Sequence, residues 1–142
     1  MRAKMCSVIF ICSAFALLLS ACQPASPKTG REVSIDQGIY YAVSVQELQT
    51  MLRDKDFTMI NVHIPWQGDI PQTDLRLAFD QISDNQEQLP EGKDDKILVY
   101  CLTSGMARIA VQSLMDLGYT NIWMLEGGTT AWEDAGLLLT KE

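Results

Sequence analysis

Residues 96–108 read Lys-Ile-Leu-Val-Tyr-Cys-Leu-Thr-Ser-Gly-Met-Ala-Arg, and this stretch decides the fold. Four apolar or aromatic residues precede Cys101, a pattern typical of a strand that is buried on both faces. A short loop follows, and the residues after it predict an amphipathic helix over 106–117. A buried strand that passes through a tight loop into a helix is typical of α/β proteins with a mostly parallel sheet.

The rest of the chain alternates between strands and helices in the same way. The predicted strands are 39–43, 57–62, 96–100 and 121–125. Besides the helix over 106–117, the predicted helices are 45–53, a short one within 79–89, and 129–135. Pro and Gly recur over 63–78 and predict a loop. We expect an α/β fold: a single domain over 37–142, with a mostly parallel five-stranded sheet and helices on both faces.

The composition limits the class of protein. The chain has 142 residues, of which 47% are hydrophobic, with a formal net charge of −7, four cysteines and one histidine. This length fits one domain with a packed core. The acidic balance argues against nucleic acid as a partner, because nucleic acid is a polyanion. No second histidine and no cysteine cluster is available for a zinc site, so we expect no metal.

The first 22 residues have the pattern of an export signal. Arg2 and Lys4 provide a basic start, and an uncharged, mostly apolar stretch follows as far as Ala21. The segment Leu19-Ser20-Ala21-Cys22 resembles the lipobox of bacterial lipoproteins, in which the cysteine receives the lipid. The alternatives are an ordinary signal peptide with an incidental cysteine, and an uncleaved anchor.

The lipobox resemblance implies a signal peptide over 1–21, followed by a lipidated Cys22 and a flexible tether over 22–36. It implies a protein of the bacterial cell envelope that is attached to the membrane through the lipid on Cys22. In a Gram-negative host, Gln23 after the cysteine implies the outer membrane, with the domain facing the periplasm. Such processing leaves Cys101 as the only free thiol, so no intramolecular disulfide is expected.

Cys101 occupies the position where α/β proteins place their sites, at the carboxyl end of a strand and next to the start of a helix. Backbone N–H groups of the loop can converge on its sulfur, and the helix N-terminus adds positive potential there. Both effects favour the nucleophilic thiolate. Thr103 and Ser104 add hydroxyl groups, and Gly105 permits a positive φ angle. The alternative is a cysteine that only packs at the end of the strand.

Two parts of the chain resemble a known family. Residues 96–137, with Leu-Gly-Tyr at 117–119 and Glu-Gly-Gly at 126–128, closely resemble the second half of a rhodanese-like domain. The segments Ile60-Asn61-Val62-His63 and Gly68-Asp69-Ile70-Pro71 look like the first half. The resemblance covers nearly all of the chain beyond the predicted tether.

The resemblance implies a sulfurtransferase that forms a persulfide on Cys101. Its thiolate attacks the outer sulfur of thiosulfate or a similar donor, and a thiol or cyanide then accepts that sulfur. The loop that holds the transferred sulfur is expected to consist of Leu102, Thr103, Ser104, Gly105 and Met106, with Arg108 as the only nearby cation. This chemistry needs neither a metal nor a cofactor, and the sequence names no protein partner.

Several residues depart from the usual pattern of the family. Leu102 and Met106 stand where active members often carry cations, and Ser104 stands where a glycine is common. Asn61 and His63 replace the usual Asp and Arg of the first-half motif. These departures favour a second hypothesis: a catalytically weak module that relays sulfur, binds a partner or senses redox state through its thiol.

Candidates for the rim of the site come from the predicted loop and the strand before it. They are Asn61, His63, Trp66 and Asp69. Simpler alternatives are a solvated histidine and a turn aspartate. A phosphatase of related fold needs a C-x5-R loop, whereas Arg108 follows Cys101 with one residue more, which misplaces the guanidinium.

Overall fold

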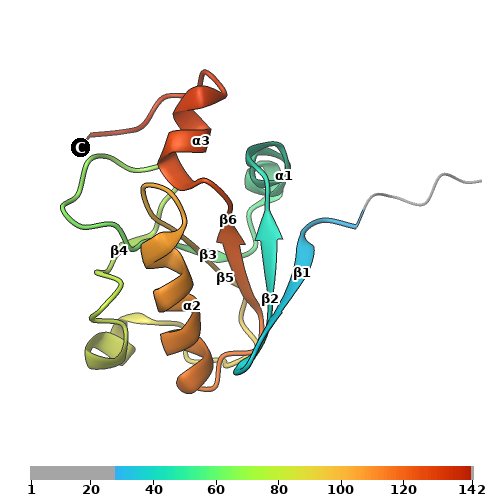
Figure 1. Ribbon diagram of the computed structural model, residues 1–142. Coiled ribbons are helices and arrows are strands. Elements are labelled where there is room, and N and C mark those ends of the chain that lie inside the picture. The colour runs from blue at the N-terminus through green and yellow to red at the C-terminus, as the bar shows by residue number, and fades with distance from the viewer. Residues whose placement is uncertain (1–27, 142) are drawn as a thin grey trace, which may run out of the picture.

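The computed structural model describes residues 28–141. Six strands form one sheet in the spatial order β1-β2-β6-β5-β3-β4 (Figure 1). The strands are β1 (Arg31–Ile35), β2 (Gly38–Val43), β3 (Thr58–Asn61), β4 (Leu75–Arg76), β5 (Ile97–Tyr100) and β6 (Ile122–Leu125). β1 runs antiparallel to β2, and every other neighbouring pair is parallel. The predicted α/β class and mostly parallel sheet are confirmed.

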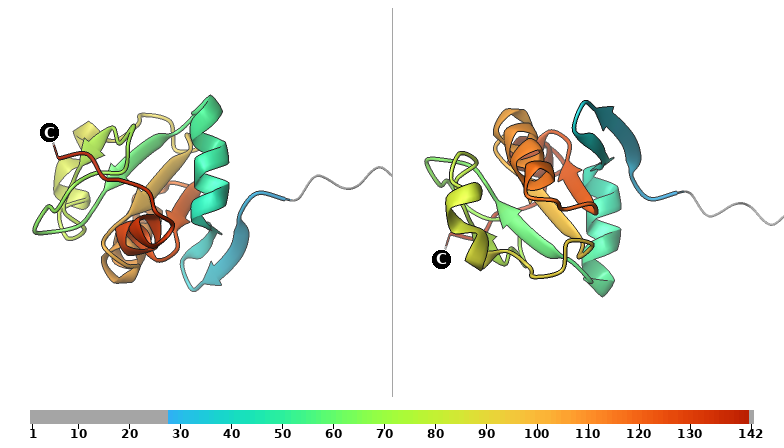
Figure 2. Two further views of the ribbon diagram at one scale, coloured as in Figure 1. Left: turned by 90° about the horizontal axis from the view of Figure 1, so that it is seen from above. Right: turned by 90° about the horizontal axis from the view of Figure 1, so that it is seen from below.

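Helices cover both faces of this sheet. They are α1 (Val45–Met51), the 3₁₀ helices η1 (Leu52–Asp54) and η2 (Ser83–Gln88), α2 (Gly105–Asp116) and α3 (Gly128–Asp134). Helix α2 and the segment around η2 pack on one face, and α1 and α3 contribute to the core on the other. Figure 2 shows α1 and α2 on opposite sides of the sheet. α2 turns Ala107, Ala110 and Leu114 into the core, which accounts for its amphipathic pattern.

The centre of the sheet is formed by a short run of wholly apolar and aromatic residues. β5 has a neighbouring strand on each side, and all four of its residues are buried. A strand covered on both faces needs apolar side chains without alternation, as β5 has. Helix α1 begins at a capping box, in which the Ser44 hydroxyl accepts the Glu47 N–H and the Glu47 carboxylate accepts the Ser44 N–H.

Two strands lie where the sequence predicted other structure. β1 falls in the predicted tether over 22–36, and β4 falls in the predicted loop over 63–78. β1 pairs with β2 across a tight turn that places Ile35 opposite Gly38, whereas β4 pairs with β3 over only two residues. The sheet therefore has six strands where five were predicted, and the predicted tether over 22–36 includes residues that belong to β1. Both strands depend on a partner strand more than on an apolar run of their own.

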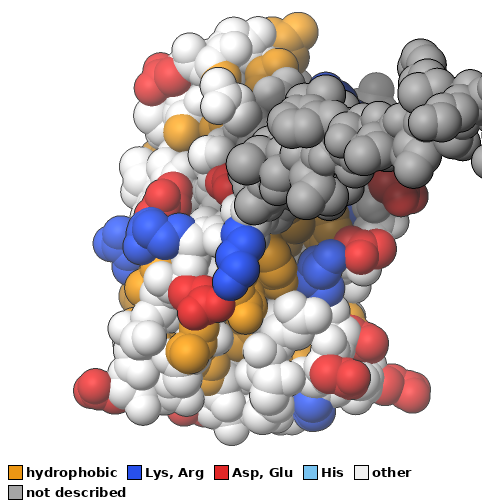
Figure 3. Space-filling view, turned by 90° about the vertical axis from the view of Figure 1, so that its right-hand side faces the viewer, with side chains coloured by type: hydrophobic (Ala, Val, Ile, Leu, Met, Phe, Trp, Pro, Cys, Tyr) orange, Lys and Arg blue, Asp and Glu red, His pale blue; other side chains and the backbone are white. Residues whose placement is uncertain are grey.

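Ion pairs join elements across the surface. Lys55 Nζ lies 2.5 Å from Asp74 Oδ2, and Arg31 in β1 pairs with Glu126 at the end of β6. Figure 3, which views the side of the molecule that carries β1, shows acidic and basic side chains interspersed there. Exposed pairs of this kind contribute little to stability, so the core supplies most of it.

The membrane-related predictions fall mostly outside residues 28–141. The predicted signal peptide, Cys22 and most of the predicted tether lie outside the described residues. Within the described part, no helix is both long enough and apolar enough to cross a bilayer.

Candidate active site around Cys101

Cys101 lies directly after β5, at the carboxyl-terminal ends of the parallel strands β3, β5 and β6. Figure 1 shows these strands. The residue is only 2% exposed and belongs to the apolar cluster on the α2 face, together with Val62 and Ala107. Met106 packs against the same cluster. The predicted position of the cysteine, between a buried strand and a helix, is confirmed.

The start of α3 holds the loop that follows Cys101. The N–H groups of Thr129 and Thr130 donate to the carbonyl oxygens of Cys101 and Leu102, each at 2.9 Å. Gly128 lies between these elements so tightly that a Cβ on it would come within 2.1 Å of the Cys101 carbonyl oxygen. The Glu-Gly-Gly motif therefore positions the cysteine loop, although it contributes no reactive side chain.

The backbone N–H groups of the loop are free to bind a ligand. Within residues 28–141, none of the N–H groups from Leu102 to Ala107 donates a hydrogen bond to another protein group. The first backbone hydrogen bond of α2 is the one from the Arg108 N–H to the Ser104 carbonyl, at 3.0 Å. No side chain caps this helix. The uncapped end of α2 thus presents several unused donors next to Cys101.

This arrangement suits an anionic sulfur. Unpaired N–H groups at a helix N-terminus stabilise negative charge, and an anionic thiolate or persulfide next to Cys101 would satisfy them. The first turn of α2 contains no acidic side chain that would oppose this effect. A nucleophilic sulfur whose charge is held by backbone donors is a suitable centre for covalent group transfer.

The other predicted loop residues surround this centre with few charges. Leu102 and Met106 are half-buried, and Thr103 and Gly105 are exposed. α2 begins at Gly105, one residue earlier than predicted. Arg108 is exposed and forms no ion pair within the described residues. The loop therefore offers mainly backbone groups to a ligand, and Arg108 is a cation without an ion-pair partner in the described part of the chain.

Asn61 and Asp69 lie on the opposite face of the sheet from the Cys101 side chain. Asn61 is paired in register with Tyr100, the residue before Cys101, and Tyr100 packs in the core on the α1 and α3 face. Neighbouring residues of a strand point to opposite faces, so Asn61 is directed away from the sulfur. The Asn61 amide donates to Asp69 Oδ1 at 2.8 Å. The structure thus separates these two residues from the predicted rim.

Asp69 is the centre of a buried polar network. Its Oδ2 accepts Arg76 Nε at 2.6 Å, and its backbone exchanges two hydrogen bonds of 2.8 Å with Thr140 near the C-terminus. Burial by itself raises the pKa of the Asp69 carboxyl, but hydrogen bonds from Asn61, Arg76 and Trp66 outweigh it, so this pKa lies below its ordinary value. The network ties the loop after β3 to the sheet and to the C-terminal segment.

Tyr100 supports the same loop, and sequence reasoning did not identify it as a functional or supporting residue. Its hydroxyl accepts the Ile70 N–H at 3.0 Å and lies 2.7 Å from Thr73 Oγ1. Burial raises the pKa of Tyr100 well above its ordinary value, so the side chain is a neutral phenol. In the sequence it reads as the last residue of an apolar strand, and nothing local indicates a polar partner.

His63 and Trp66 come from the loop that follows β3. The His63 N–H donates to Asn61 Oδ1 at 3.0 Å, while both ring nitrogens are buried without a partner among the described residues. Burial lowers the pKa of His63, which favours the neutral ring. Trp66 is 39% exposed, and Arg76 Cζ lies 4.1 Å from its ring centre. Trp66 is therefore part of the Asp69 network, and its outer surface remains open to solvent.

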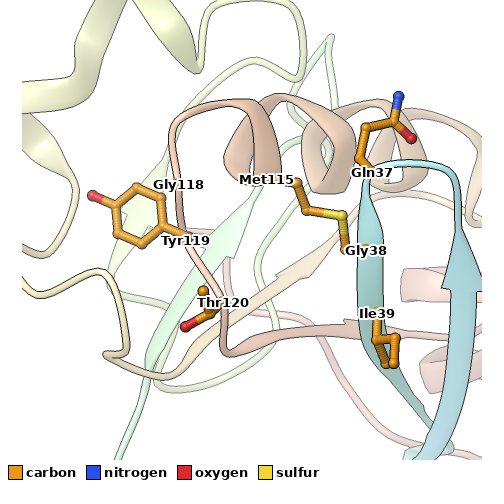
Figure 4. Close-up of a pocket in the computed structure, with 7 residues that line it drawn as sticks. All are labelled: Gln37, Gly38, Ile39, Met115, Gly118, Tyr119 and Thr120. Atoms are coloured by element: carbon orange, nitrogen blue, oxygen red, sulfur yellow. The ribbon is translucent and has the colours of Figure 1, made fainter.

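Other features of the described residues do not add to this site. No group of three or more His, Cys, Asp or Glu side chains in the described part is placed to hold a metal ion. A cavity of about 380 Å³ lies between the β1–β2 turn and the C-terminal end of α2, lined by Gly38, Met115 and Tyr119 among others (Figure 4). It is at the opposite end of α2 from Cys101.

Comparisons with known sequences find one family and several relatives that match the chain. The Rhodanese-like domain family matches residues 44–135. A protein of Allochromatium vinosum named Sulfurtransferase is 28% identical over 99 residues, which cover 67% of this chain and 90% of that protein. An uncharacterised protein of Synechocystis is 39% identical over 57 residues, which cover 40% of this chain and 32% of that protein. The match thus spans about a third of that relative's length.

Solved structures show the same fold. A rhodanese-related protein from Thermoplasma volcanium has a TM-score of 0.60 at 23% identity, covering 71% of this chain and 98% of that chain. A rhodanese-like domain protein from Staphylococcus aureus has a TM-score of 0.58 at 25% identity, covering 70% and 98%. The family match extends over more than half of the chain, from the cap of α1 to the end of α3. This chain belongs to the rhodanese-like domain family.

Proposed function

We propose that this protein is a sulfurtransferase that carries sulfane sulfur as a persulfide on Cys101. The observation that carries the proposal is the set of unused N–H groups from Leu102 to Ala107 beside this thiol. The fold, and the relative from Allochromatium vinosum that is named a sulfurtransferase, support the same chemistry. The backbone donors would hold the negative charge of the thiolate before transfer and of the persulfide afterwards.

The reaction divides into two transfers of one sulfur atom. The Cys101 thiolate attacks the outer sulfur of thiosulfate, a new S–S bond forms, and sulfite leaves with the electron pair of the bond that breaks. A second nucleophile, a thiolate or cyanide, then attacks the terminal sulfur of the persulfide and releases the Cys101 thiolate. Electrons and charge balance in each half-reaction, so no external oxidant or reductant is required.

Intact-mass spectrometry tests this proposal directly. After treatment with thiosulfate, the protein is expected to gain the mass of one sulfur atom at Cys101, and cyanide or a thiol should remove it. Cys101→Ser is expected to gain nothing. A sulfur adduct that survives this substitution, or no adduct with thiosulfate or with organic persulfides, would contradict the proposal.

A second candidate is a weakly catalytic relay that accepts sulfur from a partner protein, or a module whose thiol responds to oxidants. It is favoured by Leu102 and Met106, which leave residues 102–107 without a cation to attract a dianionic donor. Arginine at both positions is then expected to raise the affinity for thiosulfate strongly. Rapid turnover of thiosulfate by the unmodified protein would contradict this candidate.

The proposal extends to the location of the protein. The lipobox-like segment that ends at Cys22 supports attachment to a bacterial membrane through a lipid on this cysteine. In a Gram-negative host, the domain would then face the periplasm from the outer membrane. Fractionation of cells that express the full chain and are grown with a labelled fatty acid tests this. The unsubstituted protein is expected in the membrane fraction with the label, and Cys22→Ser is expected to carry no label. A labelled Cys22→Ser variant would contradict lipidation at this residue.

A further inference from the structure

Ser104 stands at the N-cap position of α2, but its hydroxyl does not cap that helix. Its Oγ accepts the N–H of Gly127, 3.0 Å away, in the turn that leads into α3. A serine at an N-cap usually accepts the second or third N–H of its own helix. The Ser104 hydroxyl is therefore turned away from the donors that it would ordinarily satisfy.

The contact is one of three that join the cysteine loop to the start of α3. The other two are backbone hydrogen bonds, which hold the carbonyl groups of Cys101 and Leu102. The contact from Ser104 to Gly127 holds the end of the loop, at the point where α2 begins. It is the only one of the three that depends on a side chain, so substitution can remove it without changing the backbone groups.

A hydroxyl that capped α2 would compete with the sulfur for the same donors. The N–H groups of Gly105, Met106 and Ala107 have no acceptor within residues 28–141. A capping oxygen satisfies one of these groups and offsets part of the positive potential of the helix end. Because Ser104 binds Gly127 instead, all three groups stay open at the end of α2 that lies next to Cys101.

We propose that Ser104 is a positioning residue for sulfur transfer. By binding Gly127, its hydroxyl fixes the end of the loop and keeps α2 uncapped, so that the N–H groups converge on the anionic sulfur of Cys101 and of its persulfide. This inference rests on the proposed function of Cys101.

The test compares three substitutions at Ser104 with one at a matched serine. Ser104→Ala removes the acceptor, Ser104→Thr keeps it, and Ser104→Asp supplies a carboxylate that favours capping α2 itself. Ser113→Ala is the control, because the Ser113 hydroxyl binds only the Ile109 carbonyl within the same helix, at 3.2 Å. The measurements are the rate of persulfide formation on Cys101 from thiosulfate per folded protein, the amide exchange of Gly127, and the Tm.

Ser104→Ala is expected to slow persulfide formation about tenfold and to speed exchange of the Gly127 N–H, because the loop loses an anchor. Ser104→Thr is expected to restore both towards the unsubstituted protein. Ser104→Asp should slow persulfide formation while the Tm is kept or rises, since a better cap stabilises the helix but occupies the donors. A merely structural role does not produce that combination. Ser113→Ala should leave the rate unchanged.

Three results would overturn the inference. The first is an unchanged rate in Ser104→Ala with only a lower Tm, and the second is a Ser104→Thr variant as slow as Ser104→Ala. Either leaves the proposed function intact, because the unsubstituted protein still forms the persulfide. The third is an unsubstituted protein that forms no persulfide with thiosulfate or an organic persulfide. In that case the proposed function fails, and the role of Ser104 fails with it.

Discussion

Gly128 is the position at which one added methyl group should disturb the candidate site most. Its φ angle is +57°, and a Cβ there would lie 2.1 Å from the carbonyl oxygen of Cys101 and 2.7 Å from that of Thr103. Carbon and oxygen atoms that are not bonded do not approach this closely, so the cysteine loop in Gly128→Ala has to move away from α3. That movement separates the N–H groups of Thr129 and Thr130 from their carbonyl acceptors.

Gly136 provides a matched control, because it has a φ angle of +79° but nothing within 4 Å of an added Cβ. Both substitutions place alanine in the left-handed region, which costs about 1–2 kcal/mol. Only Gly128→Ala also loses two hydrogen bonds, each worth about 1 kcal/mol. The free energy of unfolding is therefore expected to fall by about 3–4 kcal/mol in Gly128→Ala and by about 1–2 kcal/mol in Gly136→Ala.

Urea unfolding followed by tryptophan fluorescence measures both losses, and persulfide formation on Cys101 measures the effect on the loop. Gly128→Ala should slow persulfide formation strongly even under conditions where the protein is folded, whereas Gly136→Ala should not. If the free energies of unfolding of Gly128→Ala and Gly136→Ala fall by amounts that agree within about 0.5 kcal/mol, the expected movement of the loop is refuted. The overlap between the added Cβ and the Cys101 carbonyl oxygen would then be relieved without moving the cysteine loop. A full rate in folded Gly128→Ala would refute the expected movement as well.

Three further predictions concern charge. Asp69→Asn is expected to lower the free energy of unfolding at neutral pH by about 1–3 kcal/mol. Because the pKa of Asp69 is lowered in the folded protein, its stabilisation is complete above its ordinary value of 3.8 and is lost as the pH falls through the folded pKa. Urea unfolding across this acid range should show that loss in the unsubstituted protein and a smaller loss in Asp69→Asn; equal losses would contradict the assignment. Burial lowers the pKa of His63 from 6.5, so the free energy of unfolding should decline as the pH falls below that value. The decline should be smaller in His63→Gln, and parallel pH profiles of the two proteins would contradict this. Leu102→Arg is expected to lower the KM for thiosulfate about tenfold in steady-state assays, and an unchanged KM would show that charge at this position is irrelevant.

Four of the six strands could be predicted because their burial alone specifies them. β2, β3, β5 and β6 occupy the inner part of the sheet, where strands need apolar side chains. β1 is an edge strand with no fully buried residue, and Arg31 and Glu32 make it read as a polar linker. β4 consists of two residues whose position is set by pairing with Ile60 and Asn61. Edge strands like these are specified by a partner that the local sequence does not contain.

The position of the cysteine loop could be predicted from the local sequence, but the contacts that hold this loop against the start of α3 could not. A buried strand, a loop and a helix follow one another directly around Cys101, so sequence order conveys their arrangement. The contact between Ser104 and Gly127 joins residues that are 23 positions apart. Which turn folds against the loop depends on how β5 and β6 pair, and sequence spacing does not supply that register.

Asn61 illustrates why register limits the prediction of a site. Its position at the end of a strand next to the cysteine strand suggested a residue at the rim. In the sheet it pairs with Tyr100, which is one position before Cys101, so the two side chains occupy opposite faces. A shift of one residue in the pairing would have reversed this result. Asn61 instead joins Asp69 in supporting the loop after β3.

Leu102 and Met106 should affect which sulfur-donating substrates bind, and should affect much less whether the site can hold the transferred sulfur. In the proposed mechanism the sulfur is held by backbone N–H groups, whose positions depend on Gly128 and on the contacts with α3. None of these contacts uses the side chain of residue 102 or 106. A cation at either position would attract an anionic sulfur-donating substrate in proportion to the charge of that substrate. This attraction acts before the new S–S bond forms. Leu102→Arg is therefore expected to improve the KM for dianionic thiosulfate more than that for a singly charged organic persulfide, with little change in the rate of the transfer step itself.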